Sequence, residues 1–332
     1  MNKPRFTFSC RPYLHLHPLI EGTVAVEGAD IIFMPLEVEE IFWRQLKHEE
    51  FDVAEMSLSS YVMARSRGDE RFIAIPAFTL RIFRHSCVYV NAHKGIKGPE
   101  DLRGRKVGVP EYQMTAALWL RGFFQHEYGV HPREMEWRSG GQETPGREEK
   151  LKLQLPPDIH YEPIPEGKTL SRMLDAGELD ALFTARTPSC FADGSPNVVR
   201  MFSNFIQAEA EYYRKTGIFP IMHTIVLKRQ TYEEHPWLAM SLYKACLASK
   251  NIVLKGLLHT GGAPLYSILP WGGWEAERTR SILGDDWWPY GIEKNRTTVE
   301  ALCRYSYEQG LSVRLATMEE LFAPETFDEF KI

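Results

Sequence analysis

Hydroxyl groups crowd the end of a short apolar run in the first part of the chain. The run Val53–Met56 leads into Ser57, Ser59 and Ser60, and residues compatible with a helix continue to Ser66. The first turn of a helix leaves backbone N–H groups without partners, and such a turn can bind an anion. One serine is enough to cap a helix. We therefore expect at least one of the three hydroxyls to contact a ligand.

A second unit of the same design follows further along the chain. Lys106–Val109 is typical of a strand, Pro110 ends it, and Thr115 can cap the next helix. Tyr112 and Gln113 would then point into the space in front of that helix, although Tyr112 could equally pack between lobes. If the two units face each other, they form a clamp for a small, oxygen-rich anion.

Five further side chains could bind or titrate a ligand. Arg84 could hold a carboxylate through two hydrogen bonds, and His85 beside it could exchange a proton near neutral pH. Glu55 could accept a proton from a phenol or pin a loop. Arg186 follows an expected strand, where ligands of parallel sheets gather. His223 is a second candidate of the same kind as His85, with a buried core histidine as the alternative for each.

His15 and His17 stand one residue apart after the first expected strand. They could share a metal ion, or face a cleft as an acid or as a partner of a carboxylate. The His-x-His pattern also resembles the start of metal-dependent amidohydrolase-type barrels, some of which decarboxylate hydroxybenzoates. Such a barrel needs further metal ligands at later strands, whereas the C-terminal third here has helical patterns. We expect no bound metal and keep the metal-dependent enzyme as an alternative.

The elements that position these residues alternate between strands and helices. Strand patterns are found at Phe6–Cys10, Asp30–Phe33, Asp52–Met56, Phe72–Pro76, Ser86–Val90 and Asp180–Thr184. Helical patterns are found at Val38–Leu46, Thr115–Glu127, Leu170–Ala176, Tyr232–Leu258, Glu275–Leu283 and Thr298–Gln309. The segment Ser139–Pro157 is rich in glycine, proline and charge, which favours a surface excursion. This order predicts an α/β protein with mostly parallel sheets and a helical C-terminal region.

Composition narrows the class of protein. A chain of 332 residues favours two lobes over one core. With 39 basic and 44 acidic residues, the net charge of −5 argues against a nucleic-acid partner. The five cysteines form no C-x-x-C pair, and no apolar stretch is long enough to span a membrane. The N-terminus lacks the pattern of a signal peptide, so we expect a cytoplasmic protein.

Four stretches resemble the 4,5-dihydroxyphthalate decarboxylase family, within the type II periplasmic-binding-protein-like fold. They are Glu40–Arg44, Glu55–Tyr61, Gly108–Ala116 and Pro145–Lys150. The similarity covers nearly the whole chain. It implies one lobe made of residues 1–88 and 222–332, a second lobe of residues 89–221, and a ligand cleft between them. The chain departs from the family where many members carry Tyr-Asp-Arg-Thr, because here the run is Tyr-Leu-His-Leu-His from Tyr13.

The resemblance implies decarboxylation of an aromatic dicarboxylate without a cofactor, from 4,5-dihydroxyphthalate to protocatechuate and CO2. In this hypothesis His85, with His15 or His17, protonates the ring carbon, and Glu55 accepts a phenolic proton. Arg84, Arg186 and the two helix starts hold carboxylates. The resemblance also implies a homo-oligomer. A non-catalytic protein that binds a small anion remains the other alternative.

Overall fold

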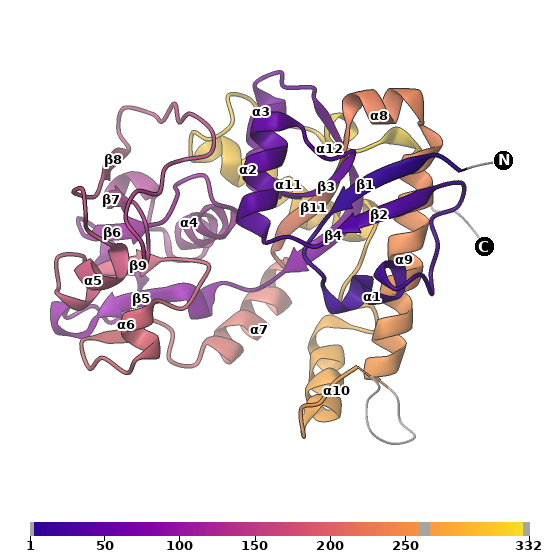
Figure 1. The fold of residues 1–332 in the computed structure, drawn as a ribbon. Helices are drawn as coiled ribbons and strands as arrows, with labels where there is room; N and C mark the ends of the chain where they lie inside the picture. The colour runs from indigo at the N-terminus through magenta and orange to yellow at the C-terminus, as the bar shows by residue number, and fades with distance from the viewer. Residues whose placement is uncertain (1–2, 259–265, 328–332) are drawn as a thin grey trace.

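The computed structural model describes residues 3–258 and 266–327. Two β-sheets lie side by side, each with helices against it (Figure 1). The α/β architecture expected from the sequence is confirmed.

The first sheet has the strand order β2-β1-β3-β11-β4. β1 pairs in parallel with β2 and β3, whereas β11 runs antiparallel between β3 and β4. Every residue of β3 is buried, including the polar Glu55 and Ser57. The strands are β1 (Arg5–Ser9), β2 (Asp30–Met34), β3 (Val53–Ser57), β4 (Phe72–Arg81) and β11 (Ile221–Lys228).

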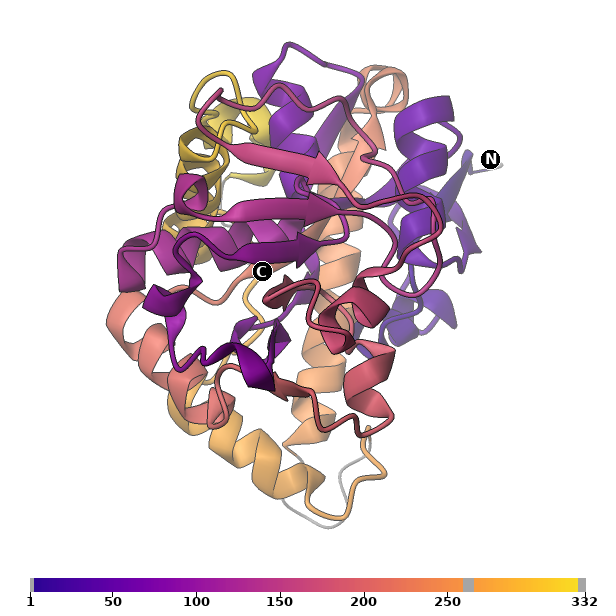
Figure 2. The ribbon, with the colours of Figure 1, turned by 90° about the vertical axis from the view of Figure 1, so that its left-hand side faces the viewer.

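The second sheet has the order β10-β5-β9-β6-β7-β8 and faces the viewer in Figure 2. Its centre is parallel, but β5 is antiparallel to both of its neighbours. Both sheets are therefore mixed, and parallel strand pairs outnumber antiparallel ones, in line with the mostly parallel sheets that the sequence predicted. The strands are β5 (Val88–Asn91), β6 (Lys106–Val109), β7 (Glu136–Ser139), β8 (His160–Pro163), β9 (Ala181–Phe183) and β10 (Val198–Arg200).

Helices cover the sheets and fill the C-terminal third. In the first sheet α2 and α3 pack against β3, and α9 packs along β4. α4 contacts β9 of the second sheet and also touches α3 and α11, so it joins the two halves. The helices are α1 (His17–Ile20), α2 (Val38–His48), α3 (Leu58–Ser66), α4 (Thr115–Tyr128), α5 (Leu170–Asp175), α6 (Ser189–Ala192), α7 (Phe205–Thr216), α8 (Arg229–Glu234), α9 (Trp237–Leu257), α10 (Gly272–Leu283), α11 (Arg296–Glu308) and α12 (Met318–Leu321).

Two helices differ from the sequence expectation. The single helix expected over Tyr232–Leu258 is divided into α8 and α9, because Pro236 has no N–H to continue the first one. α7 was not predicted at all. Its sequence is mostly charged and aromatic, and of its twelve residues only Tyr212 is fully buried. A helix with so little buried surface leaves only a faint apolar pattern in the sequence.

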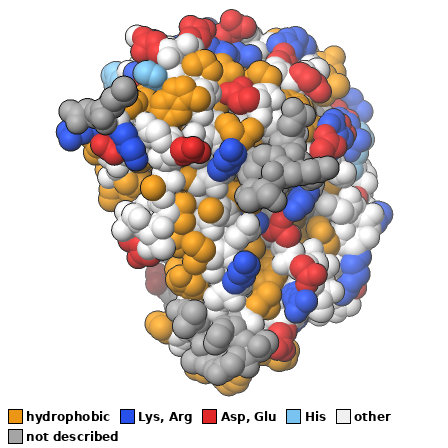
Figure 3. All heavy atoms as spheres, turned by 90° about the vertical axis from the view of Figure 1, so that its right-hand side faces the viewer, with side chains coloured by type: hydrophobic (Ala, Val, Ile, Leu, Met, Phe, Trp, Pro, Cys, Tyr) orange, Lys and Arg blue, Asp and Glu red, His pale blue; other side chains and the backbone are white. Residues whose placement is uncertain are grey.

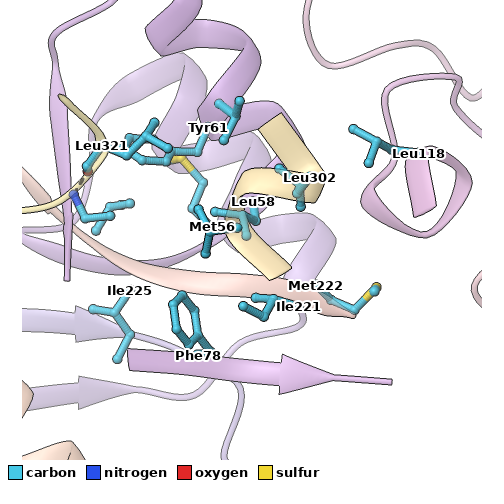
Figure 4. Close-up of a cluster of buried hydrophobic side chains, with 14 of the residues drawn as sticks. Met56, Leu58, Tyr61, Phe78, Leu118, Ile221, Met222, Ile225, Leu302 and Leu321 are labelled. Atoms are coloured by element: carbon cyan, nitrogen blue, oxygen red, sulfur yellow. Dashed lines mark hydrogen bonds between the residues drawn. The ribbon is translucent and has the colours of Figure 1, made fainter. Parts of the chain in front are cut away.

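The core is continuous from the first sheet to the helices behind it (Figure 4). The Tyr61 hydroxyl donates to the Leu321 carbonyl (2.5 Å) and accepts from the Ala74 N–H (3.2 Å). This bond ties α3 to the C-terminal segment in the middle of apolar side chains, among them Met56, Phe78 and Ile225.

The chain passes between the sheets twice, after β4 and before β11. These crossings lie near the expected lobe boundaries at residues 88 and 222, which stay a prediction. On the face drawn in Figure 3, acidic and basic side chains are interspersed with apolar ones. Among the described residues, no helix is long and apolar enough to cross a membrane.

Candidate active site

A cleft of about 180 Å³ opens between the two sheets. Its walls combine apolar side chains with an unusual number of cations. The lining residues include Arg11, Phe42, Ser57, Ser60, Leu80, Arg84, Glu111, Met114, Thr115, Arg147, Lys150, Arg186, Met222 and His223.

His223 meets a buried carboxylate at the base of this cleft. Its Nδ1 lies 2.6 Å from Oε1 of Glu55, which is fully buried. The two strands that carry these residues, β11 and β3, are neighbours in the sheet. Nε2 of His223 has no hydrogen-bond partner among the described residues, and the ring lines the cleft. The edge of the ring packs against the face of Phe42, with centroids 4.9 Å apart. This geometry fixes the tautomer and leaves one ring nitrogen for a ligand.

Glu55 is saturated with donors. The Tyr13 hydroxyl (2.7 Å) and the Thr79 hydroxyl (3.0 Å) donate to Oε1, and the Arg11 N–H donates to Oε2 (3.1 Å). Burial alone would raise the pKa of Glu55, but the His223 contact and these hydrogen bonds lower it below its usual value. Glu55 is therefore an anion that holds and polarises His223. It has no exposed surface with which to take a proton from a substrate, which differs from the expected role as a base.

Arg84 provides a buried cation in the same cleft, and the carboxyl of Glu209 is close enough to interact with its charge. Its side chain is 4% exposed, and no carboxylate of the described residues lies within ion-pair distance. Its guanidinium donates to weak or neutral acceptors, the Met222 sulfur (3.3 Å), the Cys87 sulfur (3.7 Å) and the Ala185 carbonyl (3.3 Å). A buried guanidinium without a paired carboxylate is costly, so this position favours an anionic ligand.

The other cations are partly neutralised. Arg147 and Lys150 both contact the nearly buried Glu111. Arg186 pairs with Glu39, which also lies 3.5 Å from Arg147. Cations still exceed carboxylates along the walls, so the cleft attracts an anion with more than one negative charge.

The two helix starts face each other, as expected for a clamp, but they bond directly. The Ser57 and Thr115 hydroxyls are 2.9 Å apart, and the Ser59 N–H donates to the Thr115 hydroxyl (3.2 Å). Ser60 lies at the limit of a bond to Gln113 (3.5 Å). The hydroxyls of Ser57, Ser60 and Thr115 still border the cleft.

Three of the residues expected in the clamp lie beneath the surface of the cleft. Ser59 and Gln113 are fully buried, and Gln113 donates to the Leu151 carbonyl (3.2 Å). Tyr112 is also fully buried, with its ring 3.6 Å from the Arg121 guanidinium and its edge against Trp137. These side chains are packed in the interior and do not line the cleft.

His85 does not lie on the cleft floor, contrary to expectation. Its ring stacks on Phe123, with centroids 4.4 Å apart and planes 7° from parallel, and it also contacts Phe202 and Tyr212. Burial lowers the pKa of His85 to about 4, so it is a neutral core residue near pH 7. The chain does cross between the sheets here, but Arg84 takes the cleft side and His85 the core side.

His15 and His17 are also placed outside the cleft. His15 stacks on Tyr13 and packs against Trp288, and burial lowers its pKa to about 4. His17 is exposed at the start of α1. No group of three or more His, Cys, Asp or Glu side chains within residues 3–258 and 266–327 is arranged to hold a metal ion.

Comparison with known proteins gives the family. A 4,5-dihydroxyphthalate decarboxylase from Comamonas testosteroni is 40% identical over 332 residues, which is all of both chains. The chain belongs to the 4,5-dihydroxyphthalate decarboxylase family. A member from Pseudomonas putida is 42% identical over 214 residues, 64% of this chain and 83% of that one. No family model matches the chain.

Solved structures show the fold of this family member. The alkanesulfonate-binding protein SsuA from Xanthomonas axonopodis has a TM-score of 0.53 at 12% identity, over 98% of both chains. A periplasmic sulfonate-binding protein SsuA from Methylobacillus flagellatus has a TM-score of 0.54 at 12% identity, over 98% of this chain and 92% of the other. The periplasmic-binding-protein-like fold predicted for this decarboxylase family member is thereby confirmed.

Several cleft residues of this family member were not singled out from its sequence. Arg11 follows the first strand, and Phe42 and Glu39 lie on α2. Arg147 and Lys150 lie in the glycine-rich excursion after β7, which folds back over the cleft. The signal was available, since both basic residues stand in one of the stretches that resemble the family.

Proposed function

We propose that this protein decarboxylates 4,5-dihydroxyphthalate to 3,4-dihydroxybenzoate (protocatechuate) and CO2, and that His223 supplies the proton. The observation that carries the proposal is the pairing of His223 with the buried, ionised Glu55 in a cleft rich in cations. Family membership supports the substrate, and the surplus of positive charge suits a dicarboxylate.

The reaction exchanges a carboxylate for a proton on one ring carbon. The imidazolium of His223 gives its Nε2 proton to the carbon that bears the leaving carboxylate. The bond between the ring and that carboxylate then breaks, CO2 leaves, and the bonding pair restores the aromatic ring. A hydroxyl para to this carbon supplies electron density while the carbon is protonated. One proton is consumed in each turnover, and neither oxidant nor reductant is needed.

Each part of the cleft has a separate task in this proposal. Glu55 keeps His223 oriented and stabilises its charged form before the proton is transferred. Arg84 holds the carboxylate that is retained, because its guanidinium lacks a paired carboxylate. Phe42, Leu80 and Met222 form apolar walls beside the ring. Poor solvation of the departing carboxylate on such walls favours its loss as neutral CO2.

A chelator-treated sample of the purified protein tests this proposal. It should convert 4,5-dihydroxyphthalate to protocatechuate and CO2 in equal amounts, followed by chromatography and CO2 trapping. Tight binding of the substrate without product would instead indicate a binding protein. Activity that appears only after addition of a divalent metal would support the metal-dependent alternative.

The variant His223→Gln tests the proton donor. We expect its kcat to fall by about 10²- to 10⁴-fold, the usual contribution of a positioned acid. His160→Gln is the matched control, because His160 is exposed on β8, away from the cleft. Product binding and circular dichroism establish that the variant is folded. If His223→Gln is folded and keeps full activity, another residue is the acid.

A further inference from the structure

A small polar cavity lies beside the two segments that connect the sheets, away from the cleft. Its volume is about 40 Å³. Its polar lining is made of Arg81, Tyr213, Asp286, Lys294 and Thr298. Arg81 is the last residue of β4, Tyr213 lies on α7, and Thr298 lies on α11. The cavity therefore adjoins both connections and the C-terminal helices.

Arg81 is buried there without a counter-charge. The residue is 4% exposed, and no described carboxylate lies within ion-pair distance. Its guanidinium donates to the Phe219 carbonyl (3.3 Å) and to the Asn295 side-chain oxygen, which are both neutral. Burial lowers the pKa of Arg81 to about 9, which still leaves it charged at neutral pH. The positive charge is thus hydrogen-bonded but not balanced.

The nearest acid does not balance it. Asp286 already accepts a bond from Lys250 (2.6 Å) and another from Lys294 (3.1 Å). Arg81, Lys250 and Lys294 are three cations beside one carboxylate, so two positive charges remain in excess. The buried position of Lys250 lowers its pKa, and the charges of Lys294 and Arg81 lower it further.

Several potential donors border the cavity, among them two hydroxyl groups. Thr298 is 4% exposed, and Tyr213 is partly buried. Nε of Arg81 is buried and has no hydrogen-bond partner among the described residues. Hydroxyl and guanidinium groups can both donate to an anion.

We propose that this cavity binds a small inorganic monoanion of the size of chloride, between Arg81, Lys294 and the Thr298 hydroxyl. The volume exceeds that needed by one water molecule, so the cavity has room for a halide. Asp286 opposes binding, but both of its oxygens are bonded to lysines.

The bound anion would join three parts of the chain. The Ile82 N–H donates to the Pro220 carbonyl (3.2 Å), so the two connecting segments lie side by side here. Arg81 and Phe219 belong to these segments, and Thr298 belongs to α11. A ligand that binds only the folded chain stabilises it in proportion to its occupancy.

Thermal unfolding at constant ionic strength tests the site. Replacing sodium gluconate by sodium chloride should raise Tm saturably, on the order of 4 °C at a hundredfold excess over Kd. Thr298→Val, which keeps the shape but removes the donor, should lose most of that rise. Lys168→Met is the control, since Lys168 is a surface lysine paired with Glu178 far from the cavity; it should respond as the wild type does.

Crystals soaked in bromide locate the anion directly. We expect an anomalous peak beside Arg81 and Thr298 in the wild type. The cleft also contains cations, so a peak found only there, with Thr298→Val and wild type responding equally to chloride, would overturn the proposal. Equal Tm in both salts and no peak in the cavity would mean that it holds water only.

Discussion

In the proposed mechanism, the smallest unit of function is the pair of side chains Glu55 and His223. Glu55 touches His223 but has no exposed surface, so in this proposal it would act on the substrate only through the imidazole. A residue of this kind should influence the rate of proton transfer and leave substrate binding alone.

Glu55→Gln tests that division. The amide keeps the size and one hydrogen bond but removes the charge that favours the imidazolium. We expect kcat to fall by about 10- to 10³-fold with KM nearly unchanged. Steady-state kinetics across pH would show the loss, and Glu50→Gln on the surface is the control. A raised KM with an intact kcat would instead place Glu55 in substrate binding.

His85 has a different consequence, which concerns stability. The folded protein holds its pKa near 4, below the ordinary value of 6.5. As pH falls below 6.5, the His85 imidazole takes up a proton in the unfolded chain but stays neutral in the folded chain. The contribution of His85 to the free energy of unfolding is therefore complete above pH 6.5. It is lost as pH falls toward 4, by about 1.4 kcal/mol per pH unit.

His85→Phe should remove this part of the pH dependence, because phenylalanine can stack on Phe123 and does not titrate. Urea unfolding at about pH 7 and about pH 5 measures the difference. His160→Phe, at an exposed position, should leave the slope as it is. A residual slope is expected from His15, which is buried in a similar way. An unchanged slope in His85→Phe would contradict the burial argument.

At the scale of elements, α4 and α11 pack closely where Gly122 of α4 faces Tyr305 of α11. A Cβ added at Gly122 would lie 2.1 Å from the Tyr305 ring. Alanine favours a helix by about 1 kcal/mol over glycine, but overpacking costs about 1–3 kcal/mol.

We therefore expect Gly122→Ala to destabilise the protein by roughly 1–2 kcal/mol, measured by urea unfolding. Gly273→Ala is the matched control, because Gly273 is also helical but has open space around its added Cβ. That substitution should be neutral or stabilising. A stabilised Gly122→Ala would show that α11 can shift away.

Most elements could be predicted from the sequence, and the failures have physical causes. α4 buries a long, mostly apolar run, so its signal is strong. α7 buries only Tyr212, and β10 has three residues, so neither leaves a pattern. The register puts His223 opposite Ser57 and Ile225 opposite Glu55, and it depends on pairing between distant strands. Local periodicity carries no information about it.

The same reason explains why the site was only partly predicted. Ser57, Ser60, Thr115, Arg84, Arg186 and His223 do line the cleft. Their residue types and their places at element ends indicated this. Which of two adjacent residues faces the cleft is decided by one rotation of the backbone, and at positions 84 and 85 the sequence could not distinguish them.

At the scale of the whole molecule, Glu39 links the two halves across the cleft mouth. It lies on α2, which packs on the first sheet, and contacts Arg147 and Arg186 of the second half. Exposed ion pairs contribute about 0–1 kcal/mol each, so these contacts of Glu39 should favour a closed cleft only weakly.

Glu39→Gln should open the unliganded protein. Small-angle X-ray scattering would show a larger radius of gyration at low salt, and added salt should reduce the difference from the wild type. Glu50→Gln serves as the control, because Glu50 pairs only with Arg44 beside it. Identical scattering of wild type and Glu39→Gln would mean that packing alone sets the closure.

The position of β11 in the middle of the first sheet has a consequence for synthesis. β3 and β4 do not touch each other until β11 enters between them, and β11 is made only after the whole second sheet. On the ribosome, the nascent chain can thus complete the second sheet while β3 and β4 of the first sheet still lack their shared neighbour. Glu55 meets His223 in that last insertion. A polypeptide that stalls before residue 221 carries every strand but one and lacks His223, the proposed acid.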